Sequence, residues 1–121
     1  TIAWGGRLAV YLPGALRRAA AFGHGHRYLV FCLDEVFCNT CEASHWHPEL
    51  CVPGRLRTIF NKYTMASALV HLGLDVVYLD FDTLLLQDPL PPILQAAKDK
   101  EALVARDFGS ACLNTGVIYL K

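Results

Sequence analysis

The feature that most restricts the fold of this chain is a short apolar run that ends in two aspartates. Val76–Leu79 is rich in β-branched and aromatic residues, which predicts a strand buried on both faces of a parallel sheet. Asp80 and Asp82 follow at its carboxyl end, the edge at which open α/β sheets bind ligands. Because side chains alternate in direction along extended chain, the two carboxylates are expected to point the same way, while Phe81 points back into the protein.

Two neighbouring carboxylates repel each other unless a proton or a cation joins them. Their hard oxygen atoms suit Mg²⁺ or Mn²⁺, so the pair Asp80 and Asp82 predicts a divalent metal site. The spacing alone is weak evidence, because two aspartates at this separation often arise by chance. The context strengthens the prediction, since the pair follows a predicted strand and the dipeptide Asp88-Pro89 then stops the chain from continuing as sheet.

Length and composition narrow the class of protein. The chain has 121 residues, of which 54% are hydrophobic, enough to build the core of one domain or part of one. Its 11 basic and 11 acidic residues cancel and form no run of one sign, which argues against nucleic acid or an anionic membrane as a partner. No apolar stretch approaches the roughly 20 residues that span a bilayer. Both ends of the sequence look cut, so we expect a piece of a longer protein.

Helical and strand-like patterns alternate along the chain, which predicts an α/β fold. Gly23 and Gly73 are expected to end the first two helices. The second helix would join the first strand to Val76–Leu79 through a right-handed crossover. The expected helices cover residues 13–22, 57–72 and 93–98, and the expected strands cover residues 28–33, 76–79, 103–105 and 117–120.

The segment 36–54 is expected to be a long loop without regular structure, the kind of loop that is functional or cross-linked. It contains Cys38, Cys41, His45, His47 and Cys51. Three interpretations remain open: a zinc site, a disulfide that involves Cys51, or free thiols with surface histidines. Cys32 and Cys112 lie in or before apolar runs and are expected to be buried thiols.

Three further residues are candidates for ligand contact. Asp34 ends the strand predicted at 28–33, where it either caps or turns the chain or contacts a ligand. Asn114 and Gly116 precede the last strand and suit a tight backbone position close to a ligand, although an ordinary turn explains them equally well. In the helix predicted at 57–72, Asn61 and Lys62 are expected to lie mostly away from the buried stripe.

Several motifs together resemble the nucleotide-diphospho-sugar transferase family of plants and algae, which includes arabinosyl- and xylosyltransferases. The motifs are LAVYLPGALRRAAAFG, YLVFCLDE, FNKYTMASALVHLG, DVVYLDFDTLLLQDPLPP and LNTGVIYL. The resemblance covers most of the chain from Leu8 onward. It implies an α/β, Rossmann-like GT-A fold, a UDP-sugar donor, a glycan or glycoprotein acceptor, and Mn²⁺ or Mg²⁺ as cofactor.

The resemblance also implies roles for individual residues. Asp82 would bind the metal directly, and Asp80 would contact the donor ribose or a metal-bound water and so share the metal site. Asn114 and Gly116 would line the donor sugar pocket, and Asp34 would lie near the nucleotide.

Family members are usually Golgi lumenal enzymes with a membrane anchor outside the catalytic domain. On this basis, residues 1–121 would form the N-terminal nucleotide- and metal-binding part of a domain truncated at both ends. Its first strand would be absent or truncated, and we expect the fragment alone to be inactive.

Two other classes of function compete with this interpretation. VVYLDFDTLL is also similar to the first motif of haloacid-dehalogenase-type phosphatases, in which the first aspartate attacks phosphorus and the second is the acid and base. That motif normally lies near the start of its domain and does not account for LNTG. The other alternative is a binding module without catalysis, whose Cys/His loop mediates contacts.

Overall fold

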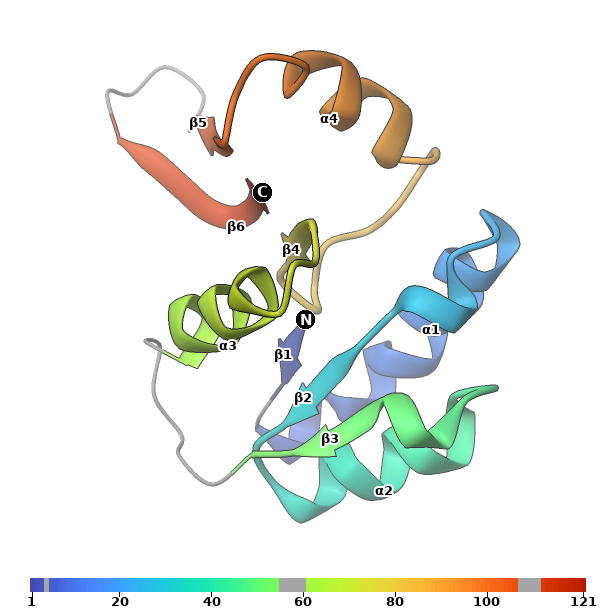
Figure 1. The fold of residues 1–121 in the computed structure, drawn as a ribbon. Coiled ribbons are helices and arrows are strands. Elements are labelled where there is room, and N and C mark those ends of the chain that lie inside the picture. The colour runs from blue at the N-terminus through green and yellow to red at the C-terminus, as the bar shows by residue number, and fades with distance from the viewer. Residues whose placement is uncertain (4, 55–60, 107–111) are drawn as a thin grey trace.

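The chain folds into two small sheets with helices packed around them (Figure 1). The computed structural model describes residues 1–3, 5–54, 61–106 and 112–121. The first sheet is parallel, with the order β1-β2-β3, and the second is antiparallel, with the order β4-β6-β5. The strands are β1 (Ile2–Ala3), β2 (Val30–Cys32), β3 (Cys51–Pro53), β4 (Val76–Leu79), β5 (Ala102–Arg106) and β6 (Leu113–Leu120). The helices are η1 (Gly6–Tyr11), α1 (Leu12–Ala21), η2 (Gly25–Arg27), α2 (Glu35–Ser44), η3 (Pro48–Leu50), α3 (Asn61–His71) and α4 (Leu90–Ala96).

Helix α1 confirms the helix expected at 13–22, shifted by one residue. Pro13 lies in its first turn, where the missing N–H costs nothing. Leu12, Leu16 and Ala19 recur at helical spacing and form its buried side. The chain leaves the helix at Gly23, whose φ of 79° is the left-handed conformation that glycine adopts without strain.

The prediction of an irregular loop over residues 36–54 is wrong. Helix α2 fills its first half, and η3 and β3 complete it. Asp34 begins α2 as an N-cap, because its Oδ1 accepts a hydrogen bond from the Phe37 amide at 2.9 Å. The loop prediction failed because Thr, Asn and Cys have low helix propensity, and tertiary contacts override this preference.

Two disulfides tie α2 to the first sheet. Cys32 of β2 pairs with Cys38, and Cys41 pairs with Cys51 of β3. Of the three interpretations left open for Cys51, the disulfide is the one observed, whereas Cys32 is not the buried thiol that was expected. Cys112, also expected to be buried, is exposed.

The surroundings of β4 differ from the prediction. Val76–Leu79 pairs antiparallel with β6, in the register Val76↔Leu120 to Leu79↔Val117, and its first two residues are only half-buried. The expected parallel sheet and the direct crossover from β2 are therefore wrong, since β2 and β4 lie in different sheets. An apolar β-branched run indicates a buried strand, but its neighbours are set by segments far away in the sequence.

Other elements differ in their boundaries. The first strand, expected to be absent or truncated, is present as the two residues of β1 and pairs with β2. Strand β2 is shorter than the 28–33 prediction, and α4 begins three residues before the helix expected at 93–98. The described part of the helix expected at 57–72 is α3, and residues 57–60 lie outside the described ranges.

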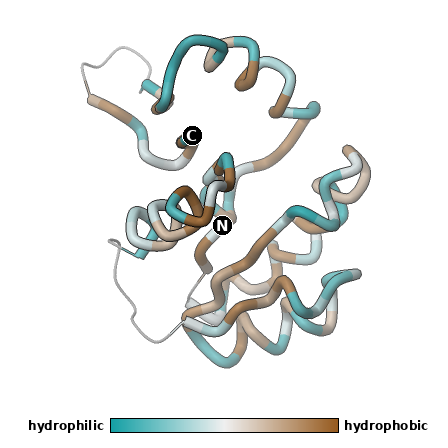
Figure 2. The backbone as a smooth tube through the Cα atoms, viewed as in Figure 1, coloured by the Kyte–Doolittle hydropathy of each residue, from teal (hydrophilic) through white to brown (hydrophobic). Residues whose placement is uncertain are grey.

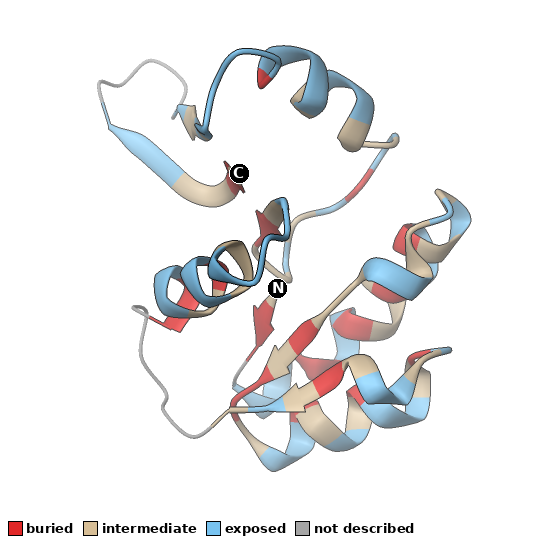
Figure 3. Cartoon of the chain, in the orientation of Figure 1, coloured by how far each residue is buried: buried red, intermediate tan, exposed pale blue. Residues whose placement is uncertain are grey.

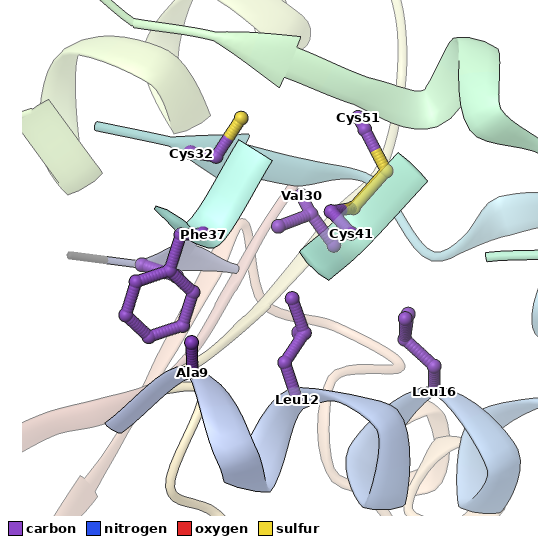
Figure 4. Close-up of a cluster of buried hydrophobic side chains, with 9 residues drawn as sticks. Ala9, Leu12, Leu16, Val30, Cys32, Phe37, Cys41 and Cys51 are labelled. Carbon is purple, nitrogen blue, oxygen red and sulfur yellow. A yellow bond between two sulfur atoms is a disulfide. The ribbon is translucent and has the colours of Figure 1, made fainter. Parts of the chain in front are cut away.

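A hydrophobic core lies between the first sheet and helices α1 and α2 (Figure 4). Figure 3 shows buried residues on β1, β2 and β3, and Figure 2 shows that β2 is strongly hydrophobic. A second cluster, formed by Ile2, Leu33, Tyr78 and Ile118, contains residues of both sheets. Because Tyr78 belongs to β4, this cluster fixes the strand that leads to the aspartate pair relative to the first sheet. Within the described residues, no helix has the length and apolarity to cross a membrane.

Candidate functional site

Asp80 lies directly after β4, with its carboxylate held between two strands and a helix. Its Oδ1 accepts a hydrogen bond from the Tyr78 hydroxyl at 2.6 Å and lies 4.0 Å from the Lys62 ammonium. Its own backbone N–H donates to the carbonyl of Gly116 on β6 at 2.8 Å. The Asp80 side chain is 38% exposed, so it is fixed by protein on one side and open to a ligand on the other.

Asp82 is exposed and lines a cavity of about 490 Å³ between α1 and residues 81–85. Tyr11, Arg17 and Arg18 form part of the opposite wall. Arg18 closes one side, since its guanidinium donates hydrogen bonds to the carbonyls of Leu85 at 2.8 Å and Leu86 at 3.3 Å. In the described part of the chain, no hydrogen bond or ion pair engages the Asp82 carboxylate, which is therefore available to a ligand.

Phe81 packs into the protein as expected, but not by alternation along extended chain, because residues 80–83 form a turn closed by a hydrogen bond from the Thr83 amide to the Asp80 carbonyl at 2.9 Å. Its ring meets Phe37 of α2 edge to face, with ring centroids 5.3 Å apart and planes at 68°. Phe37 is fully buried in the core between α1, α2 and the first sheet. The segment that carries both carboxylates is thus anchored to the first sheet and helices α1 and α2, which we call the disulfide-linked half of the molecule.

The Tyr78 hydroxyl lies against Asp80 and is also influenced by the charge of Asp82. Its pKa is raised first by burial, then by the hydrogen bond to Asp80, and further by the negative charges of Asp80 and Asp82. Tyr78 therefore stays protonated, and its hydroxyl donates a hydrogen bond to Asp80 Oδ1. Oδ2 is then the Asp80 oxygen without a hydroxyl partner.

The structure brings Asn114 and Gly116 to Asp80, as their assignment to one site requires. Oδ1 of Asn114 accepts a hydrogen bond from the Gly116 amide at 2.8 Å. A Cβ atom on Gly116 would lie 2.9 Å from Asn114 Oδ1 and 2.9 Å from Asp80 Oδ2, so only glycine fits there without displacing either group. Both residues belong to β6 itself and not to a turn before it.

A bulge in β6 produces this close approach. Val104 of β5 pairs with Ile118, whereas the next residue, Ala105, pairs with Asn114. The intervening residues of β6 therefore have no partner on β5, while Val117 still pairs with Leu79 of β4. Such bulges redirect side chains next to functional sites, and this one places Thr115 near Lys62 and Gly116 near Asp80.

Lys62 is a residue of the site that sequence reasoning missed. It was expected off the buried stripe of its helix, but it is only 8% exposed and Asn61 only 7%. The Lys62 ammonium donates to Thr115 Oγ1 at 2.8 Å, and Nζ lies 5.6 Å from the centre of the Tyr78 ring. The spacing contained the signal, because Lys62 precedes the buried Ala66 by four residues and so shares its face.

Asp34 does not join the other candidate residues. Its Oδ1 caps α2, and its Oδ2 accepts a hydrogen bond from the Gly5 amide at 2.7 Å. The capping role left open by the sequence is therefore observed. The approach of Asp34 to a nucleotide stays a prediction.

The zinc interpretation of the Cys/His segment is not supported by the structure. Cys38, Cys41 and Cys51 are in disulfides and cannot provide thiolates. His45 is buried, with Nε2 2.8 Å from the Tyr28 carbonyl and Nδ1 accepting from the His47 amide at 3.0 Å. Among the described residues, no group of three or more His, Cys, Asp or Glu side chains is arranged to hold a metal ion.

The aspartate pair fits a divalent cation that completes its coordination elsewhere. Mg²⁺ is typically held by one or two carboxylates, with waters and substrate phosphates as the remaining ligands. Asp82, open on the cavity, and Asp80, with one oxygen free of the Tyr78 hydroxyl, provide oxygen donors of that kind. The donor set therefore suits Mg²⁺ or Mn²⁺ bound together with a phosphorylated ligand.

Comparison with known proteins identifies the family to which this chain belongs. The profile of the nucleotide-diphospho-sugar transferase family matches residues 23–121, a range that contains both aspartates, Lys62, Asn114 and Gly116. The chain belongs to this family, whose described activity is sugar transfer from a nucleotide-diphospho-sugar, and the mixed α/β fold is compatible with such a domain. Searches of curated proteins and of solved structures returned no significant match.

Replacing Gly116 with alanine is expected to weaken the site and the fold together. The new methyl group would push against Asp80 Oδ2 and Asn114 Oδ1, and overpacking of this kind costs about 1–3 kcal/mol. We expect urea denaturation to show that loss of stability, and calorimetry to show about tenfold weaker Mn²⁺ binding in the presence of UDP.

Gly14→Ala is the matched control for the stability measurement only, because Gly14 lines the same cavity as Asp82. A Cβ atom on Gly14 meets nothing within 4 Å, and the residue lies inside α1, so alanine should stabilise the protein by about 0.5–1 kcal/mol. A Gly116→Ala protein as stable as the wild type would contradict the tight fit of Gly116 against Asp80.

Proposed function

We propose that this chain binds a UDP-sugar together with Mn²⁺ or Mg²⁺ at Asp80 and Asp82, and contributes to transfer of the sugar to a glycan or glycoprotein acceptor. The observation that carries the proposal is the convergence of Asp80, Asn114 and Gly116, with Asp82 two residues after Asp80 on an open cavity, in a chain of the nucleotide-diphospho-sugar transferase family. A Rossmann-like GT-A arrangement is part of the same proposal. The parallel sheet β1-β2-β3 would correspond to part of its nucleotide-binding sheet, and β4, which lies in the second sheet, would lead to the metal-binding aspartates.

The surroundings of each residue indicate its proposed role in binding the metal or the donor. Asp82, exposed on the cavity, would be the direct metal ligand. Asp80, oriented by Tyr78 and Lys62, would contact the donor ribose or a metal-bound water. Asn114 and Gly116 would line the donor sugar pocket, because the absent side chain of Gly116 lets β6 lie directly against the Asp80 carboxylate.

The reaction needs stabilisation of the negative charge that develops on the departing UDP. A bound divalent cation supplies this as a Lewis acid, worth several kcal/mol. The carboxylates need no nucleophilic role, since they would act by holding the cation to which the diphosphate of the donor binds. Their own positions are maintained by Tyr78, by the Phe81 anchor and by the amide of Thr83, which donates to the Asp80 carbonyl at 2.9 Å.

The proposal includes the cellular compartment in which the protein works. Two disulfides that join α2 to the first sheet favour an oxidising environment, because the cytosol keeps most thiols reduced. This supports a location in the Golgi lumen, with the membrane anchor in another part of the protein.

A substrate test separates the proposed function from its rivals. The protein at its natural length would be incubated with UDP-sugars and Mn²⁺, and separately with phosphomonoesters. We expect release of UDP that chelation by EDTA abolishes, and no release of inorganic phosphate. Formation of an aspartyl-phosphate on Asp80 would instead support a haloacid-dehalogenase-type phosphatase. Binding of UDP without any turnover would favour the non-catalytic module.

A further inference from the structure

We propose that Lys62 makes metal binding at Asp80 and Asp82 depend on the diphosphate of the donor, by acting as an internal counter-ion to Asp80. This inference rests on the proposed function and adds a regulatory role for a residue outside the aspartate pair. It follows from the position of one buried cation next to a pair of carboxylates.

The Lys62 ammonium is fixed beside Asp80 by several contacts. Its Nζ lies 2.8 Å from Thr115 Oγ1, 3.3 Å from the Thr115 carbonyl and 4.0 Å from Asp80 Oδ1. The Tyr78 ring lies beneath the same ammonium, with 5.6 Å between Nζ and the ring centroid. The Lys62 side chain is 9% exposed, so solvent screens its charge only weakly.

The charge of Lys62 weakens the electrostatic attraction of the site for a divalent cation. Asp80 and Asp82 together carry two negative charges, and the ammonium offsets one of them. Arg17 and Arg18 on the wall of the cavity lined by Asp82 add further positive charge. A divalent cation alone is therefore attracted only weakly and is repelled by Lys62. Few protein ligands compensate, because within the described residues no third His, Cys, Asp or Glu joins the pair.

A nucleoside diphosphate changes this balance. Its phosphates bring the negative charge and the oxygen ligands that the protein lacks, and they are themselves attracted by the ammonium. The metal and the diphosphate should therefore bind with positive coupling, in which each tightens the binding of the other by the same factor.

A purely structural role for Lys62 predicts a different result. If the lysine only pinned α3 to β6 through Thr115, its removal would lower stability but leave the coupling between metal and nucleotide unchanged. The coupling factor therefore distinguishes the two roles, whereas stability or turnover alone would not.

The experiment measures binding of Mn²⁺ to the protein at its natural length, with and without UDP, by electron paramagnetic resonance of free Mn²⁺. The variants are Lys62→Met, which removes the charge, Lys62→Arg, which keeps it, and Lys98→Met, an exposed control. Lys62→Gln serves as a second neutral variant if methionine prevents folding, which circular dichroism would reveal.

We expect the neutral variants to bind Mn²⁺ alone about tenfold more tightly than the wild type, and their coupling to UDP to fall by about tenfold or more. Lys62→Arg and Lys98→Met should keep the wild-type coupling. Wild-type coupling in the folded neutral variants would overturn the role of Lys62 while leaving the proposed function intact. Failure of the wild type to bind Mn²⁺ even with UDP, or wild-type binding by Asp82→Asn, would overturn both.

Discussion

Replacing Asp82 with asparagine is expected to lower UDP-sugar turnover by about a hundredfold or more while leaving the fold intact. Asparagine keeps the size of the side chain but loses the negative charge and one strong ligand oxygen for a hard cation. Losing about 3 kcal/mol of the stabilisation that a metal gives the departing diphosphate corresponds to that factor. Because Asp82 is exposed and engages no described partner, its stability cost should stay within about 0.5 kcal/mol.

The measurement compares kcat and KM at several Mn²⁺ concentrations, with Asp99→Asn as the matched control. Asp99 is also an exposed aspartate, but it lies beyond α4 and outside the cavity. Asp99→Asn should behave as the wild type. If Asp82→Asn retained full turnover at limiting Mn²⁺, Asp82 would not be the metal ligand, and the proposed mechanism would lose its central residue.

Local features of the site were predictable from sequence because they depend on local geometry. The inward position of Phe81 between Asp80 and Asp82 was predicted, although the chain there is a turn and not the extended chain on which the prediction relied. The tight position of Gly116 was predicted only in part, since the close approach is to the side chains of Asp80 and Asn114 and lies within β6, not in a segment before it. Helix α1 likewise follows from its own apolar period and from Pro13 and Gly23 at its ends.

Features that depend on distant segments were not predictable in this way. Whether β4 is parallel or antiparallel is decided by β6, more than thirty residues later, and no property of Val76–Leu79 reports it. The pairing of Cys32 with Cys38 depends on α2, whose residues have weak helix propensity and whose formation relies on the cap by Asp34. The burial of Lys62 depends in part on Thr115 of β6, 53 residues later, whose hydroxyl accepts a hydrogen bond from the Lys62 ammonium.

Long-range contacts also join the disulfide-linked half to the second sheet, which carries Asp80. The second sheet carries Asp80 and Gly116, whereas the first half contributes Asp34, the disulfides and the cavity wall of α1. The contact between Phe81 and Phe37 crosses from the aspartate segment to the first half, and the cluster around Tyr78 does the same behind it. The stability of the core should therefore be linked to the geometry of the site.

Replacing Phe37 with alanine is expected to test that link and to destabilise the protein more than Gly116→Ala or Asp82→Asn does. Phe37 is fully buried, and removal of a buried phenylalanine side chain costs about 3–5 kcal/mol. The same change removes the edge-to-face partner of Phe81, so the segment between Asp80 and Asp82 loses its anchor. Urea denaturation should show the loss of stability, and calorimetry at low temperature should show weaker binding of Mn²⁺ with UDP by the protein that remains folded.

Two further variants separate packing from positioning. Phe37→Leu fills much of the cavity but has no ring edge for Phe81, so it should recover most of the stability while binding of Mn²⁺ with UDP stays weakened. Val36→Ala alters a neighbouring side chain that is 53% exposed and should change stability by about 0.5 kcal/mol or less, with wild-type binding. If Phe37→Leu bound Mn²⁺ and UDP as tightly as the wild type, core packing alone would account for the effect of Phe37. The aspartate segment would then be positioned by Tyr78, Lys62 and β6, without help from the disulfide-linked half.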